Sequence, residues 1–170
     1  ENGSNIDYIS PQGGVKSLIG MDPLNIIQEG ILLSFVPEDR FGMGLVGGMN
    51  ITDNIKLRTF RDRKGILADF EKSKGLANKI VTDLEVVTPD INRTPIRRLS
   101  GGNVQKVLVG REIASNPNIL MTAYAVRGLD INTSYTIYNL LTEQKMKGVA
   151  VIYVGEDLDV LLELCDRILV

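Results

Sequence analysis

The sequence predicts an α/β domain built on a mainly parallel β-sheet. Apolar runs with the length and continuity of buried strands occur at residues 31–36, 118–124 and 149–154. Helical patterns alternate with these runs, at residues 23–30, 100–114 and 131–146. Because parallel strands need a crossover connection, usually a helix, this alternation favours a parallel sheet. The 170 residues are enough for one domain with a substantial core.

The composition is that of an ordinary globular domain, with 44% hydrophobic and 24% charged residues. A net charge of −2 gives no basic surface for nucleic acid or for an anionic membrane. No apolar run reaches the roughly 18 residues of a membrane-spanning helix, so a role at a membrane would need docking to another subunit. Histidine is absent, which excludes mechanisms with a histidine base or metal ligand. The single cysteine, Cys165, lies in an apolar segment and is expected to be a buried, inert thiol.

Near the start, alternating Ile6 and Tyr8 predict a short strand, and a glycine-containing segment follows it. This segment matches part of the phosphate-loop pattern G-x-x-x-x-G-K-[ST], although Ser10 and Val15 replace the two defining glycines. A β-branched valine does not readily adopt the backbone conformation that the second glycine allows. The segment is therefore either a plain turn or a degenerate phosphate loop comprising Gly13, Gly14, Lys16 and Ser17.

The strand predicted at 31–36 runs into Pro37-Glu38-Asp39-Arg40, and Gly44-Leu45-Val46 follows. On its own this string describes a charged turn after a strand. Residues 50–84 are polar with helical spacing, and residues 79–87 predict an amphipathic helix that the Thr88-Pro89-Asp90 segment breaks.

The helix predicted after residue 99 begins with Leu99-Ser100-Gly101-Gly102-Asn103-Val104-Gln105-Lys106. Ser100 is a good N-cap, and two glycines leave the backbone of the first turn without side chains. Such a helix start offers free N–H groups and the positive end of the helix dipole to phosphate oxygens. An ordinary capped helix after a glycine-rich turn is the alternative interpretation.

Charged turns also follow the other two predicted strands. The run 118–124 leads to Arg127-Gly128-Leu129-Asp130, in which Asp130 is either a functional carboxylate or a helix cap. The run 149–154 leads to Gly155-Glu156-Asp157, followed by an apolar tail at residues 158–170.

Taken together and in order, four of these strings resemble the ATP-binding cassette (ABC) ATPases of sugar and nucleoside importers, in particular their second, C-terminal cassette. The resemblance covers about residues 24–170. It implies a P-loop-NTPase-like fold with a helical subdomain at about 50–115 and an α/β core in the remainder of a single domain, 1–170. Few residues separate Lys16 from Glu38, so the N-terminal part looks shortened. The resemblance assigns the nucleotide-binding signature to Ser100, Gly101, Gly102, Asn103 and Gln105, the Q-loop position to Glu38, and the D-loop to Gly128, Leu129 and Asp130.

Three positions depart from a working ATPase of this family. Ala123 stands where an aspartate orders Mg²⁺, Tyr124 where a glutamate activates water, and Glu156 where a switch histidine is expected. Alanine and a neutral phenol can neither bind Mg²⁺ nor accept a proton at neutral pH. We therefore expect no catalytic residue and no metal site in this chain, and little or no ATP hydrolysis by the chain alone.

The resemblance implies that ATP and Mg²⁺ are bound mainly by a partner cassette, on which the signature of this chain acts. It also implies a second cassette, fused or separate, and transmembrane permease subunits as partners. The chain would then be cytoplasmic and peripheral on the inner face of the cell membrane. Two alternatives stay open: an active ATPase that places Glu38 or Asp130 on Mg²⁺, and a scaffold or regulator that binds no nucleotide.

Overall fold

The computed structural model describes residues 3, 5–10, 13–59 and 66–169, with the backbone alone at 66–70. The chain divides into two compact units, Glu1–Leu32 and Leu33–Val170. In the described part, no helix is both long and apolar enough to cross a membrane.

The first unit is a β-hairpin followed by a short helix. Strand β1 (Asp7–Ile9) pairs antiparallel with β2 (Val15–Ser17). Helix α1 (Pro23–Gln28) begins at Asp22, whose carboxylate accepts a 2.8 Å hydrogen bond from the amide of Leu24. It ends before Gly30, which has the left-handed φ of 84° that favours glycine. The strand and the helix predicted here are both confirmed.

The second unit contains the parallel sheet, in the order β3–β4–β5. Strands β3 (Leu33–Val36), β4 (Ile119–Ala123) and β5 (Ala150–Val154) run parallel, which confirms the predicted α/β class. Side chains alternate between the faces, so Ser34, Leu120 and Thr122 are buried on one face. On the other face, Leu33 and Ile152 are exposed.

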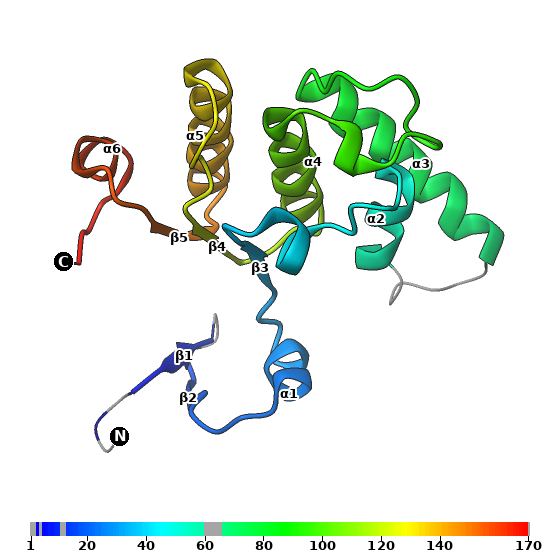
Figure 1. Ribbon diagram of the computed structural model, residues 1–170. Coiled ribbons are helices and arrows are strands. Elements are labelled where there is room, and N and C mark those ends of the chain that lie inside the picture. Colours follow the sequence, from blue (N-terminus) through cyan, green and yellow to red (C-terminus); the bar gives the residue numbers. More distant parts are fainter. Residues whose placement is uncertain (1–2, 4, 11–12, 60–65, 170) are drawn as a thin grey trace. The chain divides into compact units, whose positions relative to one another are not determined.

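Helices α4 (Gly101–Ala114) and α5 (Ile131–Met146) lie side by side, in contact with β3 and β5 respectively (Figure 1). Helices α2 (Ile51–Thr59) and α3 (Ile66–Asp83) pack together and against α4. The described residues also form a π-helical turn, η1 (Arg40–Gly44), a 3-10 turn, η3 (Ile96–Arg98), and α6 (Leu158–Leu164). Helix α4 is central to the core, because Val107, Leu108 and Val109 are all 0% exposed.

Two local expectations were wrong. The helix expected over 79–87 ends at Asp83 in α3, because Glu85 adopts a left-handed φ of 50° and the amide of Val86 turns back to the carbonyl of Val81. The thiol of Cys165 is half-buried instead of buried, since it follows the last turn of α6.

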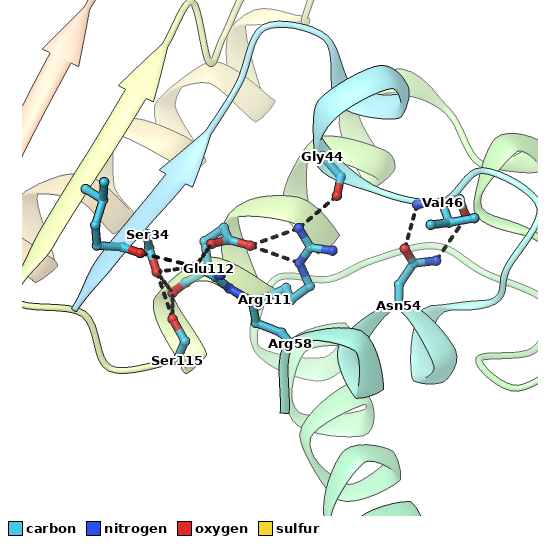
Figure 2. A network of polar contacts seen from close by, with 9 residues as sticks. Ser34, Gly44, Val46, Asn54, Arg58, Arg111, Glu112 and Ser115 are labelled. Carbon is cyan, nitrogen blue, oxygen red and sulfur yellow. Dashed lines mark hydrogen bonds and ion pairs between the residues drawn. The ribbon is translucent and has the colours of Figure 1, made fainter. Parts of the chain in front are cut away.

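A polar network joins the second half of α4, where Arg111 and Glu112 are buried, to three other elements (Figure 2). Glu112 accepts a 2.7 Å bond from Arg58 of α2 and a 2.9 Å bond from the adjacent Arg111. Arg111 also donates to the carbonyl of Gly44, while the hydroxyl of Ser34 in β3 donates to the carbonyl of Glu112. Desolvation lowers the pKa of Arg111, and the charge of Glu112 opposes that shift. The network thus ties the predicted helical subdomain to the sheet.

Candidate functional site

The sequence-predicted site residues of the second unit come together beyond the carboxyl ends of the parallel strands. Glu38 follows β3, Tyr124 follows β4 and Glu156 follows β5. This edge is where ligands bind in open α/β sheets. Arg40 connects it to the start of α4, since its guanidinium contacts both Gln105 and the carbonyl of Arg127.

The start of α4 is capped as the sequence predicts. Ser100 has extended backbone angles, and its hydroxyl accepts bonds from the amide of Asn103 at 3.4 Å and from that residue's side-chain nitrogen at 3.0 Å. Ser100 and Gly101 are exposed, so the first turn faces solvent. Packing at Gly102 is tight, because a Cβ there would lie 3.0 Å from the hydroxyl of Thr133.

The side chains of Asn103 and Gln105 are engaged within the protein. The Oδ1 atom of Asn103 accepts a 3.0 Å bond from the amide of Val87. Gln105 is 1% exposed, and its Oε1 accepts a 2.9 Å bond from Nε of Arg40. Both residues therefore position the signature helix through contacts that residue spacing alone did not reveal.

Glu38 forms an ion pair with Arg127, with 2.6 Å between Oε1 and Nη1. The guanidinium carbon of Arg127 also lies 5.9 Å from the ring centroid of Tyr124, within the range of a cation–π contact. The hydrogen bond and charge of Glu38, followed by the charge of Glu156, raise the pKa of Arg127. Carboxylates of the loops after β3 and β5 thus act on a guanidinium of the loop after β4. In the sequence, Arg127 stood out only as part of the Arg127-Gly128-Leu129-Asp130 motif.

Ala123 is the last residue of β4, and Tyr124 follows with a left-handed φ of 50°. The amide of Tyr124 donates to the carbonyl of Val154, which fixes this turn beside β5. A shallow depression here is lined by Phe35, Pro37, Glu38, Asp39, Met43, Ala123 and Tyr124. Across the described residues, no group of three acidic, cysteine or histidine side chains is arranged to hold a metal ion.

Asp130 is the N-cap of α5. Its carboxylate accepts a 2.9 Å bond from the amide of Thr133 and a 2.7 Å bond from that residue's hydroxyl. These bonds lower the pKa of Asp130. The helix-cap interpretation is confirmed, and Gly128 adopts the left-handed φ of 71° in the turn before Leu129.

The segment expected to be a degenerate phosphate loop has a different local structure. Lys16 and Ser17 lie in strand β2, paired with β1, instead of at the start of a helix. The ammonium of Lys16 forms an ion pair with Glu29, and Gly13 and Gly14 form the hairpin turn. Because a phosphate loop presents backbone N–H groups ahead of a helix, this hairpin lacks the geometry that the expectation required.

Comparisons with known proteins agree with the fold and the motifs described above. No family model matches the chain. It is 32% identical over 159 residues to a glucose import ATP-binding protein of Haloferax volcanii, covering 91% of this chain and 28% of that protein. It is 36% identical over 159 residues to a guanosine import ATP-binding protein of Bacillus subtilis, covering 91% of this chain and 30% of that protein. The chain thus spans less than a third of the length of these relatives.

The solved structures that share the fold include two of dimeric ABC cassettes. One, in a post-hydrolysis state with ADP and Pi, has a TM-score of 0.67 and 22% identity, over 85% of this chain and 61% of that chain. The other, of a bacterial ABC transporter cassette, has a TM-score of 0.67 and 24% identity, over 88% of this chain and 65% of that chain. The chain therefore has the fold of an ATP-binding cassette and is homologous to the ATP-binding proteins of sugar and nucleoside importers.

Proposed function

We propose that this chain is the nucleotide-binding domain of a sugar or nucleoside importer, and that it acts on ATP held by a partner cassette. One contrast carries the proposal. The start of α4 is capped and exposed at Ser100 and Gly101, whereas the strand ends carry Ala123, Tyr124 and Glu156 in place of catalytic groups.

The first turn of α4 suits an external phosphate. Its N–H groups carry the positive end of the helix dipole, and the hydroxyl of Ser100 adds a donor. Glycine at 101 lets a ligand approach the backbone closely. These groups hold negative charge without any proton transfer, which suits stabilisation of a phosphoryl group that another domain supplies.

The chain's own strand-end site suits nucleotide poorly. Glu38 and Glu156 place carboxylates beside Arg127, and like charge would repel a triphosphate. Tyr124 carries a phenol where a carboxylate would be needed as the base for an attacking water. ATP and Mg²⁺ would therefore be bound mainly by the partner cassette.

The partners of this domain follow from the same proposal. This chain takes the place of the second, C-terminal cassette, and a partner cassette, fused or separate, supplies the phosphate loop. Transmembrane permease subunits hold the pair at the inner face of the cell membrane, and the domain itself stays cytoplasmic. The names of the relatives, which are import ATP-binding proteins, and the dimeric solved cassettes support this arrangement.

Replacing the cap serine tests the proposal. Ser100→Arg places a bulky side chain over the first turn of α4, and we expect it to abolish ATP hydrolysis by the two-cassette assembly. The matched control is Asn139→Arg on the exposed surface of α5, which should leave hydrolysis unchanged. Hydrolysis by the assembly that survives Ser100→Arg would overturn the proposal.

A second measurement separates the alternatives. The isolated chain should hydrolyse ATP far below the usual enzyme range of about 1–10³ s⁻¹, and a rate within that range would instead identify an active ATPase. Nucleotide affinity of the partner cassette should rise when this chain is added. An unchanged affinity would favour a scaffold that takes no part in nucleotide binding.

A further inference from the structure

Arg40 makes two hydrogen bonds to segments far away in the sequence. Its Nε donates at 2.9 Å to Oε1 of Gln105 in α4, and its Nη2 donates at 2.6 Å to the carbonyl of Arg127. The side chain is half-buried. A single guanidinium therefore bridges the helix that carries the signature and the loop that carries Asp130.

The third nitrogen of Arg40 lies beside the first residue of α4. A Cβ added at Gly101 would lie only 3.3 Å from Nη1 of Arg40, which is a tight contact. Glycine at 101 thus leaves room for the guanidinium as well as for a ligand. A planar fork with donors in fixed directions can meet two acceptors at once, which the single ammonium of a lysine does less well.

The residues around Arg40 offer no second side-chain bond to replace the one that Arg40 makes to Gln105 in the described structure. Arg127 is held from the same segment twice, by Arg40 at its carbonyl and by Glu38 at its side chain. The amide of Gln105 is buried, and its Nε2 atom has no hydrogen-bond partner among the described residues. In the described structure, the side chain of Gln105 is thus held by the bond that its Oε1 accepts from Arg40. Removing Arg40 would leave the oxygen of this buried amide without a donor as well.

We propose that Arg40 is a positioning residue that fixes the start of α4 relative to the loop 124–130. It acts through Gln105 on one side and through the backbone of Arg127 on the other. Its effect on ATP hydrolysis rests on the proposed function, whereas its effect on the local structure does not.

Amide hydrogen exchange on the full chain tests the structural part. The amides of Val104, Arg127 and Leu129 donate to carbonyls within the two bridged segments. We expect Arg40→Gln to accelerate exchange at these amides about tenfold through local opening. The amide of Leu84, bonded within α3, should not change and serves as the internal reference. The control variant Arg93→Gln, at a highly exposed arginine, should leave all four rates unchanged.

Two more variants distinguish a bridge from a general loss of stability. Arg40→Lys should accelerate exchange as Arg40→Gln does, because lysine keeps the charge but not the fork. Adding Gln105→Leu to Arg40→Gln should cause no further acceleration, because both changes remove the same bond. Natural exchange rates in Arg40→Lys, or fully additive effects in the double variant, would overturn the proposal.

The functional part is measured in the two-cassette assembly. Arg40→Gln should lower kcat about tenfold and leave KM within about twofold, because the partner cassette binds the ATP while the start of α4 is misplaced. An unchanged kcat, in an assembly that Ser100→Arg inactivates, would overturn the role of Arg40. Hydrolysis that survives Ser100→Arg would instead overturn the proposed function, and the exchange rates would still decide the structural role of Arg40.

Discussion

At its first turn, α4 carries small, exposed residues, Ser100 and Gly101, whereas its last turns carry two buried charges, Arg111 and Glu112. At the first turn, the cap bonds come from Asn103 one turn away in the same helix. In the last turns, the partners come from α2, β3 and the turn η1 (Figure 2). The cap bonds at the first turn are thus local in sequence, whereas the buried charges of the last turns have partners distant in sequence.

Under the proposed function, the two ends of α4 have different tasks, stability at the buried end and anion binding at the exposed end. Buried charges are tolerated only when they are paired and hydrogen-bonded, so the far end of α4 demands its neighbours in fixed places. The near end keeps N–H groups facing solvent, where an external anion can use them. We infer that the buried end determines stability and the exposed end determines binding. The following variants test that division, beginning with the largest expected effect.

Glu112→Leu should lower the free energy of unfolding by about 3–5 kcal/mol, because it leaves Arg111 buried without its ion-pair partner. Chemical denaturation followed by circular dichroism measures this loss. The double variant Arg111→Met, Glu112→Leu removes both charges and should be less destabilised than the single variant. A single variant within about 1 kcal/mol of the natural chain would contradict the anchoring role.

Gly110→Ala should lower the free energy of unfolding by about 1–3 kcal/mol through overpacking. The added Cβ would lie 2.8 Å from Cγ2 of Ile80 and 3.0 Å from Cδ1 of Leu84, both facing α4 from the α3 segment. Gly75→Ala in α3 is the matched control, since nothing lies within 4 Å of a Cβ there. That control should gain up to about 1 kcal/mol from helix propensity, so the two changes have opposite signs.

Ser100→Ala should lower the free energy of unfolding by only about 0.5–1 kcal/mol, near the lower end for a lost helix cap. The bond from the amide of Asn103 is long, at 3.4 Å, and the site is exposed. Thermal unfolding measures the change. A loss above about 2 kcal/mol would show that Ser100 matters for stability as Arg111 and Glu112 do, and would contradict the division between the two ends of α4.

The smallest effect is the pH dependence that Asp130 contributes at the start of α5. Its pKa is lowered in the folded state, so its stabilising contribution is present above the unfolded value of about 3.9 and is lost as pH falls through the folded pKa. Unfolding measured between about pH 2.5 and pH 6 should show Asp130→Asn losing this part of the acid dependence. Identical pH profiles for the two chains would contradict the cap assignment.

Sequence patterns predicted the elements that depend on neighbouring residues. The apolar runs gave all three parallel strands, and Ser100 and Asp130 could be identified as helix caps from residue type and position. At the start, the spacing of glycine, lysine and serine left a plain turn and a degenerate phosphate loop both open, and the structure has a hairpin with a turn. Val15, whose β-branch favours a strand, carried the correct signal.

Contacts between distant residues could not be predicted in the same way. Arg40 meets Gln105 and Arg127 across 65 and 87 positions, and Arg58 meets Glu112 across 54. The spacing of residues along one helix or strand does not tell which side chains of a second element will contact it. Asn103 and Gln105 were therefore grouped with the ligand-facing residues of their motif, although both have protein partners.

The length of helix α4 determines how far its first turn moves when the helix tilts. Its 14 residues form a rod, and at 1.5 Å per residue such a rod is about 21 Å long. Glu112 clamps the helix about 17 Å from Gly101, so tilting the rod about this point by about 7° would displace its first turn by about 2 Å. That distance exceeds the tolerance of a hydrogen bond to a phosphate oxygen. In its proposed positioning role, Arg40 limits this displacement at the first turn, while Glu112 fixes the far end of α4 in the core.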